Sequence, residues 1–134
     1  MSPPGRPKGE YRGAARGTPV SQDPNCLFCK IVAGQIPSKK AYEDEDILAF
    51  HDIHPWAPVH ILIIPKRHIT SMVDVTIEDQ ALLGKMMAIS PKLMADLGVT
   101  NGYRHVINTG RDGLQEVMHV HLHVMGGPRP WLKG

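Results

Sequence analysis

The sequence predicts an α+β fold with a mainly antiparallel sheet. Strand-like segments follow one another with short, hairpin-like connections, and the helical patterns lie before and between them. The 134 residues contain no internal repeat and no second set of elements, and 42% of them are apolar, which suffices for one core. These observations indicate one globular domain.

The first segment, residues 1–22, differs in composition from the rest of the chain. It carries four arginine or lysine side chains against the single Glu10, so its charge is +3, and the remaining chain carries −1 of the total of +2. It is rich in proline and glycine and cannot bury enough apolar surface to fold alone. We predict a disordered basic tail here and a folded domain over residues 23–134. A targeting segment or a weak polyanion contact is the alternative.

No apolar run approaches the length of a membrane span, and no signal-peptide pattern opens the chain. We therefore expect a cytoplasmic protein, with a nuclear or organellar pool as the alternative. Neither a membrane nor a specific nucleic acid is expected as a partner.

Cys26 and Cys29 form a Cys-x-x-Cys pair at the start of the predicted domain. Such a pair can be a redox dithiol, half of a metal site or two buried thiols. The proline-rich segment before it supplies no strand for the redox alternative, and a structural disulfide is not expected inside a cell. A metal site needs two more ligands from elsewhere in the chain.

The first half of the domain is predicted to alternate short elements with turns. A helix is expected over residues 30–33, closed by Gly34. The acidic turn at residues 43–46 is expected to be solvated, and residues 54–58 form a loop interrupted by two prolines. The segments predicted as strands are residues 40–43, 47–51 and 60–64. The last is the most apolar run of the chain, and we expect it at the centre of the sheet.

Residues 76–97 show an amphipathic helical pattern, with Thr76 placed to cap it and Gly98 to end it. Pro91 lies inside this pattern. Because proline removes a hydrogen bond and clashes with the preceding turn, we predict a kink or interruption near Ser90.

Residues 103–108 are predicted to form a strand, and the glycine-rich turn 109–113 returns the chain into the segment 118–125. The two segments form a predicted hairpin. This pairing brings Asn108 close to the histidines of the second strand.

Within that second strand, His119, His121 and His123 alternate with apolar residues. Alternate side chains of a strand share a face, so the three histidines form one row with Cα atoms roughly 6.5 to 7 Å apart. A row of imidazoles is an unusual polar face, because protonated rings repel one another, and we interpret it as functional. The residues expected to face the core are Met118, Val120, Leu122 and Val124.

Residues 119–125 resemble, without a mismatch, the signature of the histidine triad (HIT) nucleotide-binding hydrolases. Gly126-Gly127 and Trp131 resemble the Hint branch of phosphoramidases. The resemblance implies five strands, two helices and a homodimer whose sheets continue across the interface. It also extends to residues 26–34, 49–53 and 64–69.

The activity implied by the resemblance is cleavage of the P–N bond of purine nucleoside 5′-phosphoramidates through a covalent nucleotidyl-histidine. No metal is needed for this chemistry, and a Walker-type phosphate loop is absent from the sequence. The alternatives are a dinucleoside polyphosphate hydrolase, or a nucleotide- or zinc-binding regulatory protein of the kinase C inhibitor type with incidental hydrolysis.

The resemblance also implies roles for individual residues. His121 is the nucleophile, His123 contacts the phosphate or leaving group, and His119 and His60 belong to the orienting and proton-transfer network. From the residues alone, His60 is equally an ordinary hydrogen-bonded histidine of a strand. The implied zinc ligands are Cys26, Cys29, His68 and His119. The implied nucleotide-binding residues are Leu27, Phe28, Ile31, Phe50, His51, Asp52, Ile53 and Asn108.

One segment departs from the family pattern. The Hint branch usually has Gly-Gly-Gln-Ser before the triad, whereas this chain has Gly113-Leu114-Gln115-Glu116. Strict alternation from His119 turns Glu116 away from the site, and an irregular backbone turns it inward, so its direction stays open. An inward carboxylate would slow the turnover of anionic substrates and attract cationic leaving groups.

Overall fold

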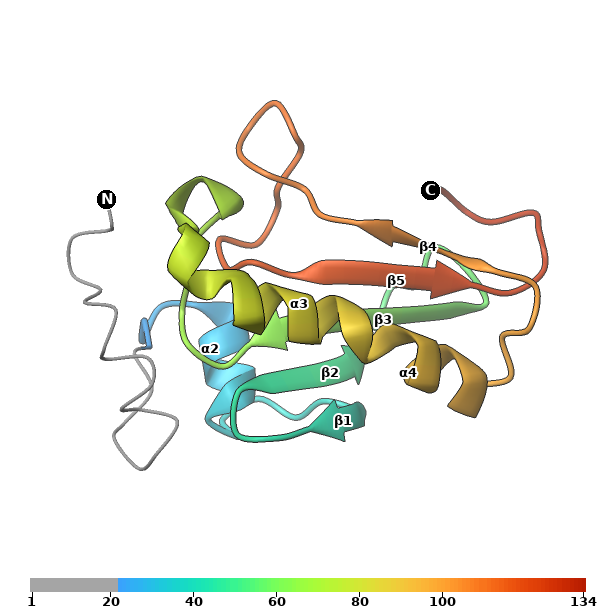
Figure 1. Ribbon diagram of the computed structural model, residues 1–134, viewed down its shortest axis with the longest axis horizontal. Helices are drawn as coiled ribbons and strands as arrows, with labels where there is room; N and C mark the ends of the chain where they lie inside the picture. Colours follow the sequence, from blue (N-terminus) through green and yellow to red (C-terminus); the bar gives the residue numbers. More distant parts are fainter. Residues whose placement is uncertain (1–21) are drawn as a thin grey trace.

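The computed structural model describes residues 22–134 and contains one open sheet of five strands (Figure 1). The strand order is β1-β2-β3-β5-β4, and each neighbouring pair is antiparallel, which confirms the predicted class. The predicted tail, residues 1–22, lies outside the described residues except for Gln22. The elements are α2 (Leu27–Val32), β1 (Lys40–Glu43), β2 (Ile47–His51), β3 (Val59–Pro65), η1 (Met72–Asp74), η2 (Ile77–Asp79), α3 (Gln80–Ala88), α4 (Ser90–Asp96), β4 (Tyr103–Val106) and β5 (Leu122–Gly126).

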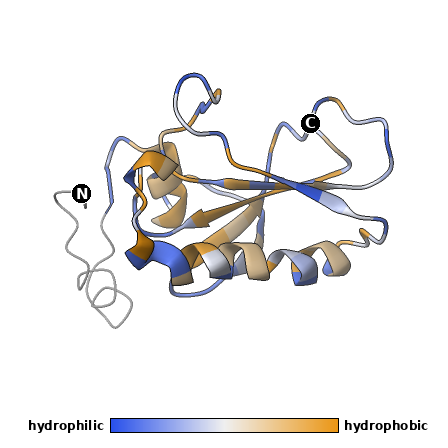
Figure 2. Ribbon diagram, turned by 45° about the horizontal axis from the view of Figure 1, so that its top comes forward, coloured by the Kyte–Doolittle hydropathy of each residue, from blue (hydrophilic) through white to orange (hydrophobic). Residues whose placement is uncertain are grey.

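The sheet buries apolar side chains on both faces, because neighbouring residues of a strand point to opposite sides. In β3, Ile61 and Ile63 pack in the core that includes α3 and α4, whereas Leu62 and Ile64 pack in the core that includes α2. Figure 1 shows α3 and α4 running along the sheet, and Figure 2 shows hydrophobic colour along much of the sheet and mixed colour along these helices. The central position predicted for β3 is confirmed.

Helix α2 begins three residues earlier than the predicted start of residues 30–33. Cys26 supplies the start signal, because its backbone is extended and its Sγ accepts a hydrogen bond from the Cys29 N–H at 3.4 Å. Gly34 follows the helix with φ +79°, a conformation that favours glycine. The earlier start places Phe28 within the helix, where it is buried.

The amphipathic pattern of residues 76–97 is divided among η2, α3 and α4. Helix α4 begins at Ser90, so the interruption falls just before Pro91, as predicted. Thr76 caps η2 and forms a reciprocal capping box with Asp79. None of the described helices has the length and apolar character needed to cross a membrane.

Strand β5 covers only the second half of the predicted triad strand, and residues 118–121 have no regular strand structure. The alternation of side chains nevertheless continues through them. Val120, Leu122 and Val124 all lie in the core that includes α3 and α4. The three histidines between them are buried on the face that carries α2.

Met118 does not join the core, and the prediction that it does is wrong, since Met118 is 47% exposed. Strand β4 was predicted to reach residue 108 but ends at Val106, which pairs with His123, and β5 begins only at Leu122, so Met118 lies outside the paired part of the sheet. The chain is held two residues later, where the Val120 N–H donates to the Ile69 carbonyl at 2.7 Å.

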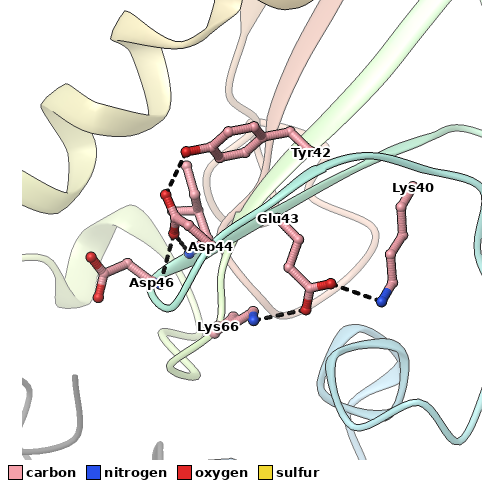
Figure 3. A network of polar contacts seen from close by, with 7 residues as sticks. Lys40, Tyr42, Glu43, Asp44, Asp46 and Lys66 are labelled. Carbon is pink, nitrogen blue, oxygen red and sulfur yellow. Dashed lines mark hydrogen bonds and ion pairs between the residues drawn. The ribbon is translucent and has the colours of Figure 1, made fainter. Parts of the chain in front are cut away.

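The acidic turn between β1 and β2 is held by specific contacts, and the prediction of a simply solvated turn is wrong (Figure 3). Asp44 accepts hydrogen bonds from the Tyr42 hydroxyl at 2.7 Å and from the N–H groups of Asp46 and Ile47. These contacts close the turn and connect it to α3. The ion pairs of the turn join Glu43 to Lys40 and Lys66, and Asp44 and Asp46 to Lys85.

Replacing Asp44 by Asn is expected to lower the free energy of unfolding by about 1–2 kcal/mol at neutral pH. Burial alone raises the pKa of Asp44, but hydrogen bonds from Lys85, Tyr42 and main-chain N–H groups outweigh burial and lower the pKa from 3.8 to about 2. Because the folded-state pKa lies below the unfolded-state value, this stabilisation is present above about pH 4 and lost as the pH falls through about 2. Urea unfolding at both pH values measures it.

The matched control is Glu45→Gln, an exposed position of the same turn, which should leave stability unchanged within about 0.5 kcal/mol. A loss for Asp44→Asn that is the same at neutral and at acidic pH would show that the charge of Asp44 is not the cause.

Candidate active site

All eight residues predicted to bind a nucleotide line one cavity of about 680 Å³. Pockets of this size hold nucleotide-sized ligands. His121 and His123 line the same cavity, whereas His60 and His119 are not among its lining residues and are almost fully buried. The eight predicted residues are Leu27, Phe28, Ile31, Phe50, His51, Asp52, Ile53 and Asn108.

One part of the cavity is apolar. Phe28 and Phe50 meet edge to face with ring centroids 5.6 Å apart, and Phe28 meets His121 in the same way at 5.2 Å. Ile53 lies at the rim, 84% exposed, and Leu27 is 45% exposed. An exposed apolar side chain beside a cavity offers a surface to a flat, weakly polar ligand group.

The hydrogen bond of His121 fixes which of its nitrogens is protonated. The His121 Nδ1 lies 2.7 Å from the His119 carbonyl oxygen, which can only accept, so Nδ1 carries the proton. Burial lowers the pKa of His121, so the ring is neutral at pH 7. Its Nε2 therefore has a free lone pair, the arrangement that a nucleophile requires.

A chain of hydrogen bonds gives His123 the opposite character. The Trp56 N–H donates to Nδ1 of His60 at 3.0 Å, so the neutral His60 ring carries its proton on Nε2. That proton is donated to Nδ1 of His123 at 2.9 Å. Burial, with the charges of neighbouring groups, lowers the pKa of His123 to about 3. His123 is therefore neutral with an N–H at Nε2, and it serves as a donor.

Asp52, His60 and His123 also lie close enough to share a metal ion, with ligand atoms within 4.8 Å of one another. The hydrogen bond from Trp56 argues against a metal here. A metal on Nε2 of His60 would require the proton of the neutral ring to move to Nδ1, where it would face the Trp56 N–H. We interpret this cluster as a hydrogen-bonded network.

A second cluster brings together the four predicted metal ligands. The four ligand atoms of Cys26, Cys29, His68 and His119 lie within 4.8 Å of one another. Nδ1 of His119 is 3.3 Å from the Cys26 Sγ and 3.2 Å from Nδ1 of His68, and the Cys29 Sγ is 3.3 Å from Nδ1 of His68. The sequence separation of 93 residues between Cys26 and His119 is closed by α2 packing against the triad segment.

The donor set of this cluster fits zinc, for which two sulfurs and two imidazole nitrogens in tetrahedral arrangement are a common structural site. The outer nitrogen of His119 donates to the Pro65 carbonyl at 2.8 Å, so its Nδ1 presents a lone pair to the cluster. Burial lowers the pKa of His119 to about 4 and raises that of the Cys29 thiol to about 12. Both shifts favour the uncharged forms of these two side chains.

The structure separates the two functions that the sequence assigned to His119. Its side chain faces the cysteines and does not line the cavity. Its carbonyl accepts the proton that orients His121. The same residue thus connects the cluster of Cys26, Cys29 and His68 to the cavity through its main chain.

Sequence reasoning missed Trp56 and Lys133, both of which line the cavity. The Trp56 ring stacks on His123 with centroids 4.7 Å apart and an interplanar angle of 19°, and the Lys133 Nζ lies 4.4 Å from the Trp56 ring centroid. The Leu132 N–H donates to the Trp56 carbonyl at 2.7 Å and fixes this segment. An aromatic residue four positions before His60 was the available signal for Trp56, whereas no local pattern marks Lys133.

The direction of Glu116, which the sequence left open, is given by the irregular backbone of residues 110–121. Glu116 lines the cavity together with Leu114, His121 and Asn108. Asn108 has a further task, because its amide donates to the Gly113 carbonyl at 2.8 Å.

Comparisons with known proteins agree with this geometry. A family model described as HIT domain matches residues 33–129. Protein HitA of Neisseria gonorrhoeae is 49% identical over 104 residues, which cover 78% of this chain and 97% of that protein. The solved structure of a HIT family hydrolase from Legionella pneumophila has a TM-score of 0.76 at 49% identity, covering 78% of this chain and 95% of that one. A histidine triad protein from Clostridium difficile has a TM-score of 0.78 at 39% identity, covering 81% and 96%. The chain belongs to the HIT family of histidine triad proteins.

Proposed function

We propose that this protein is a hydrolase that cleaves the P–N bond of purine nucleoside 5′-phosphoramidates through a covalent nucleotidyl-His121 intermediate. The observation that carries the proposal is the opposite character of two neighbouring rings, since His121 presents a lone pair and His123 presents an N–H. A phosphorus atom bound between them meets a nucleophile and a donor together. The HIT family hydrolases of Legionella pneumophila and Clostridium thermocellum support hydrolysis as the reaction class.

In this proposal each part of the nucleotide lies against the part of the cavity that matches it in polarity. The purine lies against the apolar side chains of Leu27, Phe28 and Phe50. Asp52 accepts hydrogen bonds from the ribose through its Oδ2 atom. The other oxygen, Oδ1, already accepts from the His54 N–H at 2.8 Å, whereas Oδ2 has only Nε2 of His60 nearby, at 3.6 Å. The remaining lone pairs of Oδ2 suit hydroxyl donors.

The reaction takes place in two displacements at phosphorus. The lone pair on Nε2 of His121 forms a P–N bond, and the electron pair of the substrate P–N bond goes to the leaving nitrogen, which takes up one proton from solvent and departs as an amine. Water then forms the new P–O bond, the electron pair returns to His121, and one proton is released. The N–H of His123 hydrogen-bonds to the oxygen or leaving nitrogen that gains charge.

The charges of the cavity favour a phosphoramidate over a dinucleoside polyphosphate. Among the described residues that line it, Lys133 is the one lysine or arginine, and Asp52 and Glu116 are carboxylates. A polyphosphate chain brings several negative charges and would need more cations. A phosphoramidate monoanion brings one.

The proposal is tested by measuring turnover of adenosine 5′-phosphoramidate, diadenosine polyphosphates and adenylated lysine with one preparation. We expect the two P–N substrates to be hydrolysed at least about a hundredfold faster, in kcat/KM, than the polyphosphates. A preference for the polyphosphates would replace the proposal by the second hydrolase class. Nucleotide binding without turnover of any of the three would indicate a binding protein.

We also propose that Cys26, Cys29, His68 and His119 hold a structural zinc ion. When bound, zinc would fix α2 against the triad segment and take no part in the chemistry. The chain's own contribution is the Pro65 carbonyl, which holds the His119 ring, and Thr70, whose hydroxyl lies 3.1 Å from Nε2 of His68.

Protein purified without added metal is expected to contain about one zinc per chain by elemental analysis. Cys29→Ala should remove most of it and lower the melting temperature by about 10 °C or more, since metal binding contributes directly to folding. A chelator should bring the wild-type protein to the melting temperature of the variant. Zinc near zero in wild-type protein of unchanged stability would leave the cysteines as buried thiols.

We propose a homodimer in which the sheets of two copies continue through an edge strand. Of the two edges, β4 is the more exposed. We also keep the cytoplasm as the proposed location.

A further inference from the structure

Residues 114–117 form part of the cavity wall and include two exposed side chains that the proposed chemistry does not use. Leu114 and Glu116 both line the cavity, and both are exposed. The residue between them, Gln115, is buried. The segment therefore presents two side chains to a ligand and anchors itself through the third.

Gln115 makes that anchor firm. Its side-chain oxygen accepts from the Gly110 N–H at 3.0 Å, and its amide donates to the carbonyls of Thr70 at 2.7 Å and Val117 at 3.0 Å. Gly113 adds a close approach, because a Cβ there would clash with the Thr109 carbonyl oxygen. The positions of Leu114 and Glu116 are thus set by the loop backbone.

Leu114 has φ +63° and is the one described non-glycine residue with positive φ. L residues rarely adopt this conformation, and glycine adopts it freely. Leu114 is also 75% exposed, so its side chain contributes little to the core of this molecule. A strained residue beside a cavity points to a contact with a ligand.

The charge of Glu116 has no counterpart in the nucleotide. Glu116 lines the same cavity as His121, so its negative charge faces the ligand that the nucleophile attacks. Purine and ribose carry no positive charge at pH 7, and the phosphate is negative. A favourable partner for this carboxylate therefore has to lie on the leaving group.

The opposite charge lies beside the other histidine. Lys133 is held over the Trp56 ring, and the Trp56 ring stacks on His123. The charge of Lys133 is one of the causes that lower the pKa of His123, after burial and the neighbouring histidines. This position suits the anionic phosphate, which is next to the His123 N–H in the proposed complex. The phosphate and the leaving group thus meet charges of opposite sign.

We propose that Leu114 and Glu116 form a leaving-group subsite that selects alkylammonium amines, with Leu114 on the alkyl part and Glu116 on the ammonium. The substrate class is a nucleoside phosphoramidate of a diamine: one nitrogen is bonded to phosphorus and the other is protonated. This inference rests on the proposed function, and the reaction is the P–N cleavage described above, which releases the diamine.

The test compares three adenosine phosphoramidates of similar length, made from propylamine, 1,3-diaminopropane and β-alanine. In wild-type protein the diamine compound should have a kcat/KM about three to ten times that of the propyl compound, and the β-alanine compound should be the poorest. Glu116→Gln should bring the diamine-to-propyl ratio close to one. Raising the salt concentration should lower the wild-type ratio, because it screens exposed charges.

Leu114→Ala should reduce kcat/KM for the propyl compound about threefold relative to the unsubstituted phosphoramidate. Glu45→Gln, an exposed glutamate that does not line the cavity, should leave all ratios unchanged. A diamine-to-propyl ratio that persists in Glu116→Gln, or a wild-type ratio of one, would overturn the subsite while leaving the phosphoramidase proposal intact. Absence of turnover on every P–N compound would overturn both.

Discussion

His121→Ala is expected to lower the turnover of adenosine 5′-phosphoramidate by roughly ten-thousand-fold or more. The variant lacks the Nε2 lone pair, and neither neighbouring ring can replace it. Nδ1 of His119 faces the cysteines, and the two nitrogens of His123 are an acceptor occupied by His60 and a donor. Steady-state kinetics measures the loss, and mass spectrometry after an acid quench should find a nucleotidyl adduct in the wild type alone.

Binding of AMP provides the control for His121→Ala, because the apolar part of the cavity and Asp52 are unchanged in the variant. The dissociation constant should change by less than about tenfold in calorimetry. His105→Gln removes another histidine, one that does not line the cavity, and should keep normal turnover. Residual turnover within tenfold of wild type would disprove nucleophilic attack by His121.

His60→Leu is expected to reduce kcat about a hundredfold, with a smaller change in KM. His60 does not line the cavity and acts as a positioning residue through the proton of His123. Leucine neither accepts from the Trp56 N–H nor donates to His123, so Nε2 of His123 loses its fixed proton. The partly buried Trp56 N–H also loses its acceptor.

His60→Gln is the matched rescue. Its carbonyl oxygen can accept from Trp56 and its amide can donate to His123, which reproduces both hydrogen bonds of the neutral ring. We expect turnover within about tenfold of the wild type. Nitrogen NMR of His123 reports directly which nitrogen is protonated. Equal losses in the two variants with an unchanged His123 spectrum would show that His60 is only structural.

Local sequence patterns predicted the strand faces and the helix interruption, because both depend on residues that are close together in the chain. The alternation in residues 119–124 gave the correct face for Val120, Leu122 and Val124 and for the three histidines, and the apolar run 60–64 gave the central strand. Pro91 marked the interruption between α3 and α4, because the missing N–H is a property of proline itself. These features need no information about distant residues.

The features that sequence reasoning missed depend on contacts between distant segments. The Asp44 turn is held by Lys85 of α3, and Met118 is exposed because it lies before the start of β5, outside the paired part of the sheet. Lys133 reaches the cavity through the contact of Leu132 with Trp56, a separation that no local pattern encodes. The two groups of histidines, His68 with His119 beside the cysteines and His60 with His123, likewise depend on such contacts. Their different roles are visible only from the hydrogen-bond partner of each ring nitrogen.

The group that fixes the protonation of the His60–His123 pair belongs to the main chain, since it is the N–H of residue 56. Every amino acid except proline supplies this N–H. The indole at the same position stacks on His123 and borders the cavity, so it is free to be exchanged without removing the donor. For protein engineering, position 56 thus separates two properties: a library of side chains there can reshape the cavity while the proton that His60 donates to His123 stays in place.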